Sequence, residues 1–263
     1  MAPLLLLMNF YSQMSIFNFK KFSVVNERSS MKVNTDGVLL GAVMTVRESD
    51  RRVLDVGTGT GTIALMAAQR ITEISDNSLH VDAIDIDEPS ASEAGDNFKN
   101  SPWGSMLQAH NLSLDAFELR CEALLAENKD VCYDLICSNP PYFDNALQAP
   151  EERRNAARHT STGLSYREIL DFAAKYLSAD GRVAMVLPAD TEPDLTRYAR
   201  MSGLHLSKIT RVRTVPRKSP IRIIAEFSRQ RNANPEDCIL TIQNEGQYTD
   251  QYLSLTKEFY LFA

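Results

Sequence analysis

Short runs of β-branched and apolar residues alternate with longer amphipathic stretches from Arg52 to about Arg229. This alternation is typical of repeated strand–helix units around a largely parallel sheet. The predicted strands are 53–55, 80–86, 106–110, 131–138, 182–187, 206–213 and 221–227. The predicted helices are 62–70, 89–100, 114–128, 165–177 and 191–201.

The last two predicted strands are joined only by 214–220, which contains Pro216 and Pro220 and is too short for a helix. Such a connection favours an antiparallel hairpin, which we place at the sheet edge. The pattern therefore predicts an α/β doubly wound fold with a seven-stranded, mostly parallel sheet and an antiparallel edge hairpin.

The chain divides into a main domain, 19–231, and two flanking parts. Residues 1–18 are interpreted as an N-terminal extension, whose short apolar run fits neither a transmembrane helix nor a signal peptide. Residues 232–263 are interpreted as a linker and a docking helix, because Tyr248, Tyr252, Leu255 and Phe259 recur at helical spacing. We expect a cytoplasmic protein without membrane contact.

Composition narrows the class of protein further. With 263 residues, 44% hydrophobic and 24% charged, the chain is neither disordered nor a disulfide scaffold. Its four cysteines lack zinc spacing, so we expect no metal. The net charge of -6 argues against coating nucleic acid by bulk charge, but a local basic face remains open.

A glycine-rich turn follows the first predicted strand, in the sequence Leu-Asp-Val-Gly-Thr-Gly-Thr-Gly-Thr. Glycines at such a turn let backbone N–H groups approach a ligand at a helix N-terminus. The third glycine of a dinucleotide fingerprint would fall at Thr62, and no Lys-Ser or Lys-Thr pair follows, which disfavours NAD and a phosphate-binding loop. An aminocarboxylate suits this turn better. The candidate contacts are Asp55, Gly57, Thr58, Gly59 and Gly61.

The second predicted strand ends in acids. Asp85 can accept both hydroxyls of an unphosphorylated ribose, as in S-adenosylmethionine, which we expect as the cofactor. For Asp87, a role as N-cap of the next helix is favoured over ligand contact.

The fourth predicted strand ends in Asn139, Pro140, Pro141 and Tyr142, which should face the same crevice. Asn139 and the Pro140 carbonyl can accept the two N–H groups of a conjugated amino group, turning its lone pair towards a methyl donor. Consecutive prolines stiffen the loop, and Tyr142 offers a face for stacking. We expect these four residues to be catalytic.

Basic residues gather late in the chain. Residues 205–232 hold eight Lys or Arg residues against one acid, which favours a nucleic-acid face over the predicted hairpin. The candidate RNA contacts are Arg213, Arg217 and Lys218, together with Arg158, which follows the Asn-Pro-Pro-Tyr loop. A charged edge that only blocks strand pairing is the alternative interpretation.

Residues 19–229 resemble the bacterial tRNA1(Val) adenine-37 N6-methyltransferases, which are Rossmann-like class I S-adenosylmethionine-dependent enzymes. The resemblance rests on Asn-Pro-Pro-Tyr, Phe19-Lys20-Lys21-Phe22, the segment from Met31 to Ala42, Asn100-Ser101-Pro102-Trp103 and Ala157-Arg158-His159. It implies tRNA as the partner and places Thr35 and Asp36 near the methionine end of the cofactor. Where many relatives carry an acid that meets the cofactor adenine, this chain has Ser113, so Ser113 or Asp115 would serve.

Two other functions stay open from sequence. A protein-glutamine methyltransferase would share Asn-Pro-Pro-Tyr, although only about fifty residues precede Asp55, too few for the helical domain typical of that class. A catalytically silent RNA-binding module is disfavoured by the intact glycine turn, Asp85 and Asn139. We expect a monomer.

Overall fold

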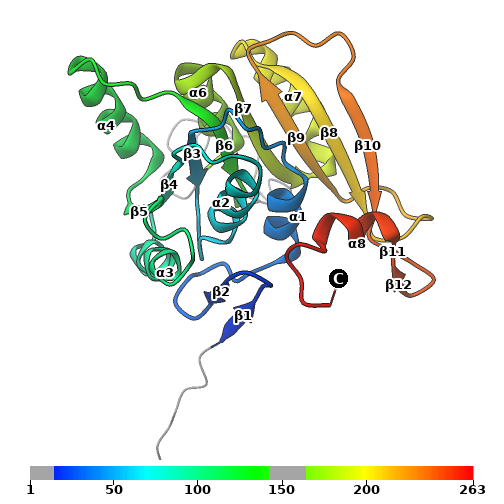
Figure 1. The fold of residues 1–263 in the computed structure, drawn as a ribbon. Coiled ribbons are helices and arrows are strands. Elements are labelled where there is room, and N and C mark those ends of the chain that lie inside the picture. Colours follow the sequence, from blue (N-terminus) through cyan, green and yellow to red (C-terminus); the bar gives the residue numbers. More distant parts are fainter. Residues whose placement is uncertain (1–14, 142–163, 263) are drawn as a thin grey trace, which may run out of the picture.

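A computed structural model of the protein describes residues 15–141 and 164–262. Its centre is an eight-stranded sheet in the order β10-β8-β9-β7-β6-β3-β4-β5 (Figure 1). The strands are β3 (Arg52–Val56), β4 (His80–Asp85), β5 (Leu107–Asn111), β6 (Tyr133–Ser138), β7 (Leu177–Pro188), β8 (His205–Arg213), β9 (Arg222–Ser228) and β10 (Glu236–Thr241).

One strand of the sheet, β9, runs opposite to all the others. The pairs formed among β3 to β7 are parallel, as is the pair of β10 and β8, whereas β9 pairs antiparallel with both β7 and β8. The chain leaves β3 towards β4 and β5, then returns to place β6 on the other side of β3. Ligands of open α/β sheets bind at such a switch point, outside the carboxyl ends of the strands. The crevice beyond Val56 and Ser138 is therefore where a ligand is expected.

Helices cover both faces of the sheet (Figure 1). One face packs on α1 (Thr35–Val43), α2 (Thr62–Ile74) and α3 (Glu88–Lys99), and the other on α4 (Leu114–Ala126), α6 (Tyr166–Tyr176) and α7 (Glu192–Met201). The central strands are apolar on both faces because both are covered, as Leu54 and Val53 show with no exposure. A short 3-10 turn, Ala189–Thr191, precedes α7.

The seven predicted strands and five predicted helices are confirmed with small shifts of their ends. The sheet nevertheless has an eighth strand, which corrects the predicted count and the interpretation of 232–263 as only a linker and a docking helix. Strand β10 runs parallel to β8 and covers it, so the β8–β9 hairpin does not form the sheet edge. Opposite charges lie on the two strands, and Arg211 of β8 forms an ion pair with Asp237 of β10.

The two ends of the described chain meet at one end of the sheet (Figure 1). The hairpin β1 (Ile16–Asn18) and β2 (Ser23–Val25) carries Phe19 next to Tyr260, with ring centroids 6.1 Å apart. After the small hairpin β11 (Gln243–Asn244) and β12 (Gln247–Tyr248), helix α8 (Asp250–Thr256) buries Tyr252 in the core. A tail helix thus forms and packs against the main domain, but it is shorter than predicted: Tyr248 lies in β12 and Phe259 follows the helix.

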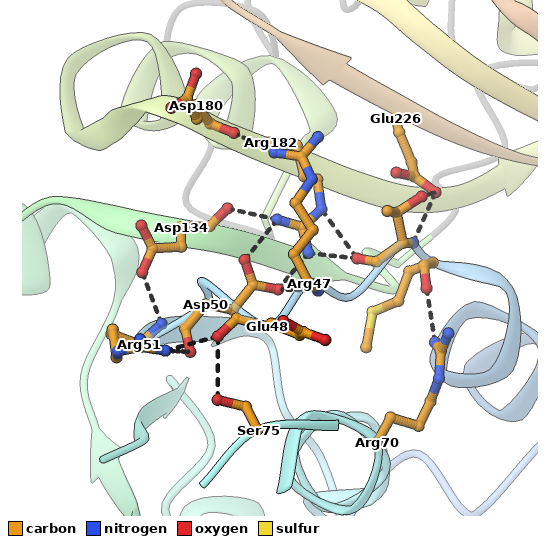
Figure 2. Close-up of polar contacts among 12 residues, drawn as sticks. Arg47, Glu48, Asp50, Arg51, Arg70, Ser75, Asp134, Asp180, Arg182 and Glu226 are labelled. Carbon is orange, nitrogen blue, oxygen red and sulfur yellow. Dashed lines mark hydrogen bonds and ion pairs between the residues drawn. The ribbon is translucent and has the colours of Figure 1, made fainter. Parts of the chain in front are cut away.

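A buried ion pair fixes the connection between α1 and β3 (Figure 2). The Arg182 guanidinium donates to both carboxylate oxygens of Asp50, at 2.9 and 2.6 Å, and to the carbonyls of Thr45 and Asp134. Arg70 donates to the carbonyls of Gly41 and Met44 at the end of α1. Breaking a buried pair by removing one partner typically costs about 3–5 kcal/mol, so this network holds α1 firmly against the sheet.

In the described ranges, no helix is long and apolar enough to cross a membrane. Within the same ranges, no group of three or more His, Cys, Asp or Glu side chains is placed to hold a metal ion.

Candidate active site

The glycine turn links β3 to α2 at the switch point. Gly57, Gly59 and Gly61 have φ of 70, 56 and 82°, a region that favours glycine. A Cβ on Gly61 would lie 2.5 Å from Cε1 of Phe98, so this position has no room for a side chain. The turn keeps the backbone bare where a ligand would approach the start of α2.

Asp55 supports this turn from inside the protein. Its side chain has no exposure, and Oδ2 accepts hydrogen bonds from Thr58 Oγ1 at 2.7 Å and from the Ala64 N–H at 3.2 Å. Burial raises the pKa of the Asp55 carboxyl to about 6, although these hydrogen bonds oppose the shift. Asp55, which the sequence predicts as a cofactor contact, thus stabilises both the glycine turn and the first helical turn of α2.

We predict that this burial makes the effect of an Asp55→Asn substitution depend on pH. The folded protein resists ionising Asp55 until about pH 6, whereas the ordinary pKa is 3.8. Unfolding thus releases protons between these values, and stability falls as the pH rises through this window. The free energy of unfolding of the wild type should drop by about 2 kcal/mol relative to the variant between about pH 4 and 7. Denaturant titrations at both pH values measure this, and a pH-independent difference would contradict it.

Asp85 lies at the end of β4, beside the glycine turn. Its Oδ2 accepts the Gly59 N–H and its Oδ1 accepts the Asp87 N–H, both at 2.9 Å. Burial raises the pKa of the Asp85 carboxyl, although these two hydrogen bonds oppose the shift. Asp87 caps α3 by accepting the Ser90 N–H at 3.1 Å, which confirms its predicted role. The carboxylate of Asp85 thus stands at the predicted place next to Gly59.

The reacting loop follows β6, the strand paired with β3. Ser138 anchors it by donating to the Val56 carbonyl at 2.7 Å. Asn139 is 7% exposed, with its Nδ2 3.5 Å from Met31 Sδ, and Pro141 is exposed. Tyr142, the fourth predicted residue, lies outside the described residues. The structure therefore brings Asn139 and Pro140 to the same crevice as the glycine turn.

An N-terminal segment crosses the glycine turn from the other side. We call residues 25–34 the strap. Its Ser29 Oγ and Met31 carbonyl would lie 3.4 and 3.7 Å from a Cβ on Gly59. A small cavity of ≈ 30 Å³ lies between strap, turn and loop. It is lined by residues 31–34, 58–60, Gly37, Thr62, Ile63 and Asn139.

Thr35 and Asp36 begin α1 directly after the strap. Asn34 caps this helix by accepting the Gly37 N–H at 2.9 Å. Asp36 accepts a hydrogen bond at 2.8 Å from Nε of Arg222, the first residue of β9. The two predicted residues thus lie between Asn34 and Gly37, which line the cavity, but they do not line it themselves. Asp36 links the start of α1 to the basic part of the chain.

Sequence reasoning missed two buried polar residues on α3, Glu93 and Asn97. Glu93 accepts three backbone N–H groups of the strap, and Asn97 bonds both the strap and the glycine turn. Their signal was weak: two polar side chains four residues apart on the helix face that carries Ala94 and Phe98 into the core.

The remaining predicted residues do not line the cavity, as far as the described part of the chain shows. Ser113 caps α4, accepting the Ala116 N–H at 3.2 Å. Arg213 donates to Thr241 Oγ1 at 2.8 Å and to the Pro216 carbonyl at 2.9 Å. Arg217 and Lys218 are exposed in the turn after β8, at the active-site end of the sheet, and Arg158 lies outside the described residues.

Ion pairs neutralise part of the basic stretch. Arg211 pairs with Glu192 as well as Asp237, Arg222 with Asp36, and Lys208 with Glu226 at 3.8 Å. Net charge along the sequence therefore overstates the basic face, and Arg217 and Lys218 are its exposed part at this end.

Comparisons with known proteins agree with this geometry. The family described as "Methyltransferase small domain" matches residues 28–194. A tRNA1(Val) (adenine(37)-N6)-methyltransferase of Parabacteroides distasonis is 40% identical over 93% of this chain and 97% of its own length. A relative of the same name from Flavobacterium psychrophilum is 36% identical over 94% and 99%.

A solved structure supports the fold alone. The crystal structure of a predicted O-methyltransferase from Agrobacterium tumefaciens has a TM-score of 0.60 at 15% identity, covering 85% of this chain and 96% of that one. From the sequence matches over nearly the whole chain, the protein belongs to the methyltransferase small domain family and to the tRNA1(Val) (adenine(37)-N6)-methyltransferases within it.

Proposed function

We propose that this methyltransferase uses S-adenosylmethionine to methylate the exocyclic N6 amino group of adenine 37 in tRNA1(Val). The observation that carries the proposal is the meeting of two motifs at the switch point of the sheet: the glycine turn after β3 and Asn139-Pro140 after β6. The relatives' activity supports the choice of substrate. We propose that the reaction takes place in the cytoplasm, where tRNA is modified.

The crevice residues fit the cofactor in two respects. Three glycines at positive φ leave every second position of the turn without a side chain, so its backbone is open to a bulky ligand there. The Asp85 carboxylate beside Gly59 suits two neighbouring ribose hydroxyls, because an ionised acceptor makes strong hydrogen bonds. When bound, S-adenosylmethionine would supply a methyl carbon activated by its sulfonium.

Asn139 and Pro140 would prepare the amino group for attack. The side-chain oxygen of Asn139 and the Pro140 carbonyl each accept one N–H, which turns the nitrogen lone pair away from the conjugated ring. These hydrogen bonds strengthen as the nitrogen becomes tetrahedral and positive, so they stabilise the transition state more than the ground state. The buried setting of Asn139 keeps this arrangement rigid.

Transfer of labelled methyl from S-adenosylmethionine tests the proposal. The protein is incubated with total tRNA from a strain lacking the modification or, separately, with release-factor peptides. We expect label in tRNA alone. Label in the peptides would favour the protein-glutamine methyltransferase alternative, and label in neither would favour the silent binding module.

The exposed turn after β8 gives a prediction for tRNA binding. Replacing Arg217 and Lys218 together by Ala should weaken binding across RNA sequences and flatten its salt dependence. Each lost phosphate contact should lower the log–log salt slope by about 0.7–0.9. Binding isotherms at several salt concentrations provide the measurement.

A control variant removes the same charge from the opposite end of the sheet. Lys129 and Arg231 are exposed there, before β6 and after β9, and their joint replacement by Ala should leave the slope unchanged. If the Arg217 and Lys218 variant also kept its slope, the RNA face would lie elsewhere, with Lys20, Lys21, Arg28 and Lys32 as the next set to replace.

A further inference from the structure

Only Val25, the first residue of the strap, belongs to a strand ladder, and the strap is held mainly by hydrogen bonds from the neighbouring helix α3. Three buried α3 side chains reach it, Ser90, Glu93 and Asn97. Two more, Ser92 and Asp96, bond the side chain of Arg28. Because α3 also packs against the sheet through Phe98, it offers the strap a rigid support.

Glu93 makes the densest of these contacts. Its side chain has no exposure, and its Oε2 accepts the N–H groups of Glu27 at 2.8 Å and Arg28 at 2.7 Å. Its Oε1 accepts the N–H of Ser29 at 3.0 Å. A buried carboxylate is costly without hydrogen bonds, and here three consecutive backbone donors compensate for it.

Both oxygens of Glu93 must be acceptors in this geometry. A glutamine in its place would turn an NH₂ group either towards the N–H groups of residues 27 and 28 or towards that of Ser29. In each orientation a donor faces a donor, and a buried N–H loses its partner. The strap would then be released on one side.

Asn97 joins the strap to the glycine turn. Its Oδ1 accepts the Val25 N–H at 2.8 Å, while its Nδ2 donates to the carbonyls of Val25 at 3.0 Å and Thr60 at 2.9 Å. The side chain is 1% exposed, so water does not replace these bonds. The strap and the turn are therefore fixed to one helix.

We propose that Glu93 is a positioning residue for the cofactor crevice: it clamps the strap so that Met31 and Val33 form a wall opposite the glycine turn. This inference rests on the proposed cofactor site. The cavity between Met31, Gly59 and Asn139 exists because the strap is held at its distance from the glycine turn. Glu93 itself lies behind the strap and touches no reacting group.

The test compares Glu93→Gln with Asp96→Asn. Asp96 lies three residues further along α3 and pairs with the Arg28 side chain at 2.6 Å, but its side chain is 47% exposed and it holds no strap backbone. Calorimetric titration with S-adenosylhomocysteine should give a dissociation constant about tenfold higher for Glu93→Gln and an unchanged one for Asp96→Asn. At saturating S-adenosylmethionine, kcat should stay within about twofold of the wild type, because the reacting loop is untouched.

These results separate positioning from a purely structural role. If Glu93→Gln lowers Tm but binds S-adenosylhomocysteine as tightly as the wild type, the inference is overturned while the proposed function stands. If the wild type does not bind S-adenosylhomocysteine, the proposed cofactor site itself fails.

Amide hydrogen exchange on the wild-type protein covers the case in which the variant does not fold. The amides of residues 27–29 should exchange slowly and become slower still when S-adenosylhomocysteine is added. Unchanged exchange at these three amides on addition of a ligand that calorimetry shows to bind would contradict the proposal.

Discussion

Replacing Asn139 by Ala is expected to lower turnover by about 10²–10³ while leaving the affinity for S-adenosylmethionine nearly unchanged, the scale of losing one preorganised polar group. The side chain lies after β6 at the edge of the crevice, where its oxygen can accept an amino proton that develops charge during transfer. Single-turnover kinetics with tRNA and calorimetry with S-adenosylmethionine separate the two quantities.

Two further variants sharpen this test. Asn139→Asp retains an acceptor oxygen at the same place and should keep more activity than the alanine variant. Asn100→Ala removes the same group from the exposed end of α3 and should change neither turnover nor affinity. Wild-type turnover in Asn139→Ala would remove this residue from the reacting site.

Replacing Asp85 by Ala is expected to weaken the binding of S-adenosylmethionine by about 1.5–3 kcal/mol, the usual scale for a charge-assisted hydrogen bond. The structure adds a second reason: Asp85 also accepts the Gly59 N–H, so its loss loosens the glycine turn. Calorimetric titration measures the change.

Asp87→Ala serves as the matched control, since Asp87 lies two residues away and caps α3. Losing this cap should lower the free energy of unfolding by about 1 kcal/mol without weakening the binding of the cofactor. Equal affinities for the Asp85→Ala variant and the wild type would show that Asp85 does not contact the cofactor.

Sequence alone predicted the central sheet well, because apolar β-branched runs such as those of β3, β4 and β6 are bounded by turns and spaced by helices. It missed α1, whose residues from Gly37 to Val43 are all buried and therefore show no amphipathic period. It also missed β10, whose polar start reads as a loop and which forms a strand only because β8 offers it an open edge.

The structure brings together those predicted site residues whose sequence signal is local. The glycine turn, Asp85 and Asn139 each end a strand, and strand order brings them together. Glu93 and Asn97 were missed because their partners in the strap are backbone groups more than sixty residues away, which no motif records. The basic face was overstated for a related reason, since charge counting does not detect the pairing of Arg211 and Arg222 with distant acids.

Mass-spectrometric mapping of an unmodified tRNA1(Val) transcript, treated with the protein and S-adenosylmethionine, tests the central claim most directly. The account predicts a single new N6-methyladenosine at position 37 and none in a transcript carrying guanine there. Methylation of another base or position, or a transcript left unmodified by a protein that binds S-adenosylmethionine and tRNA, would contradict it.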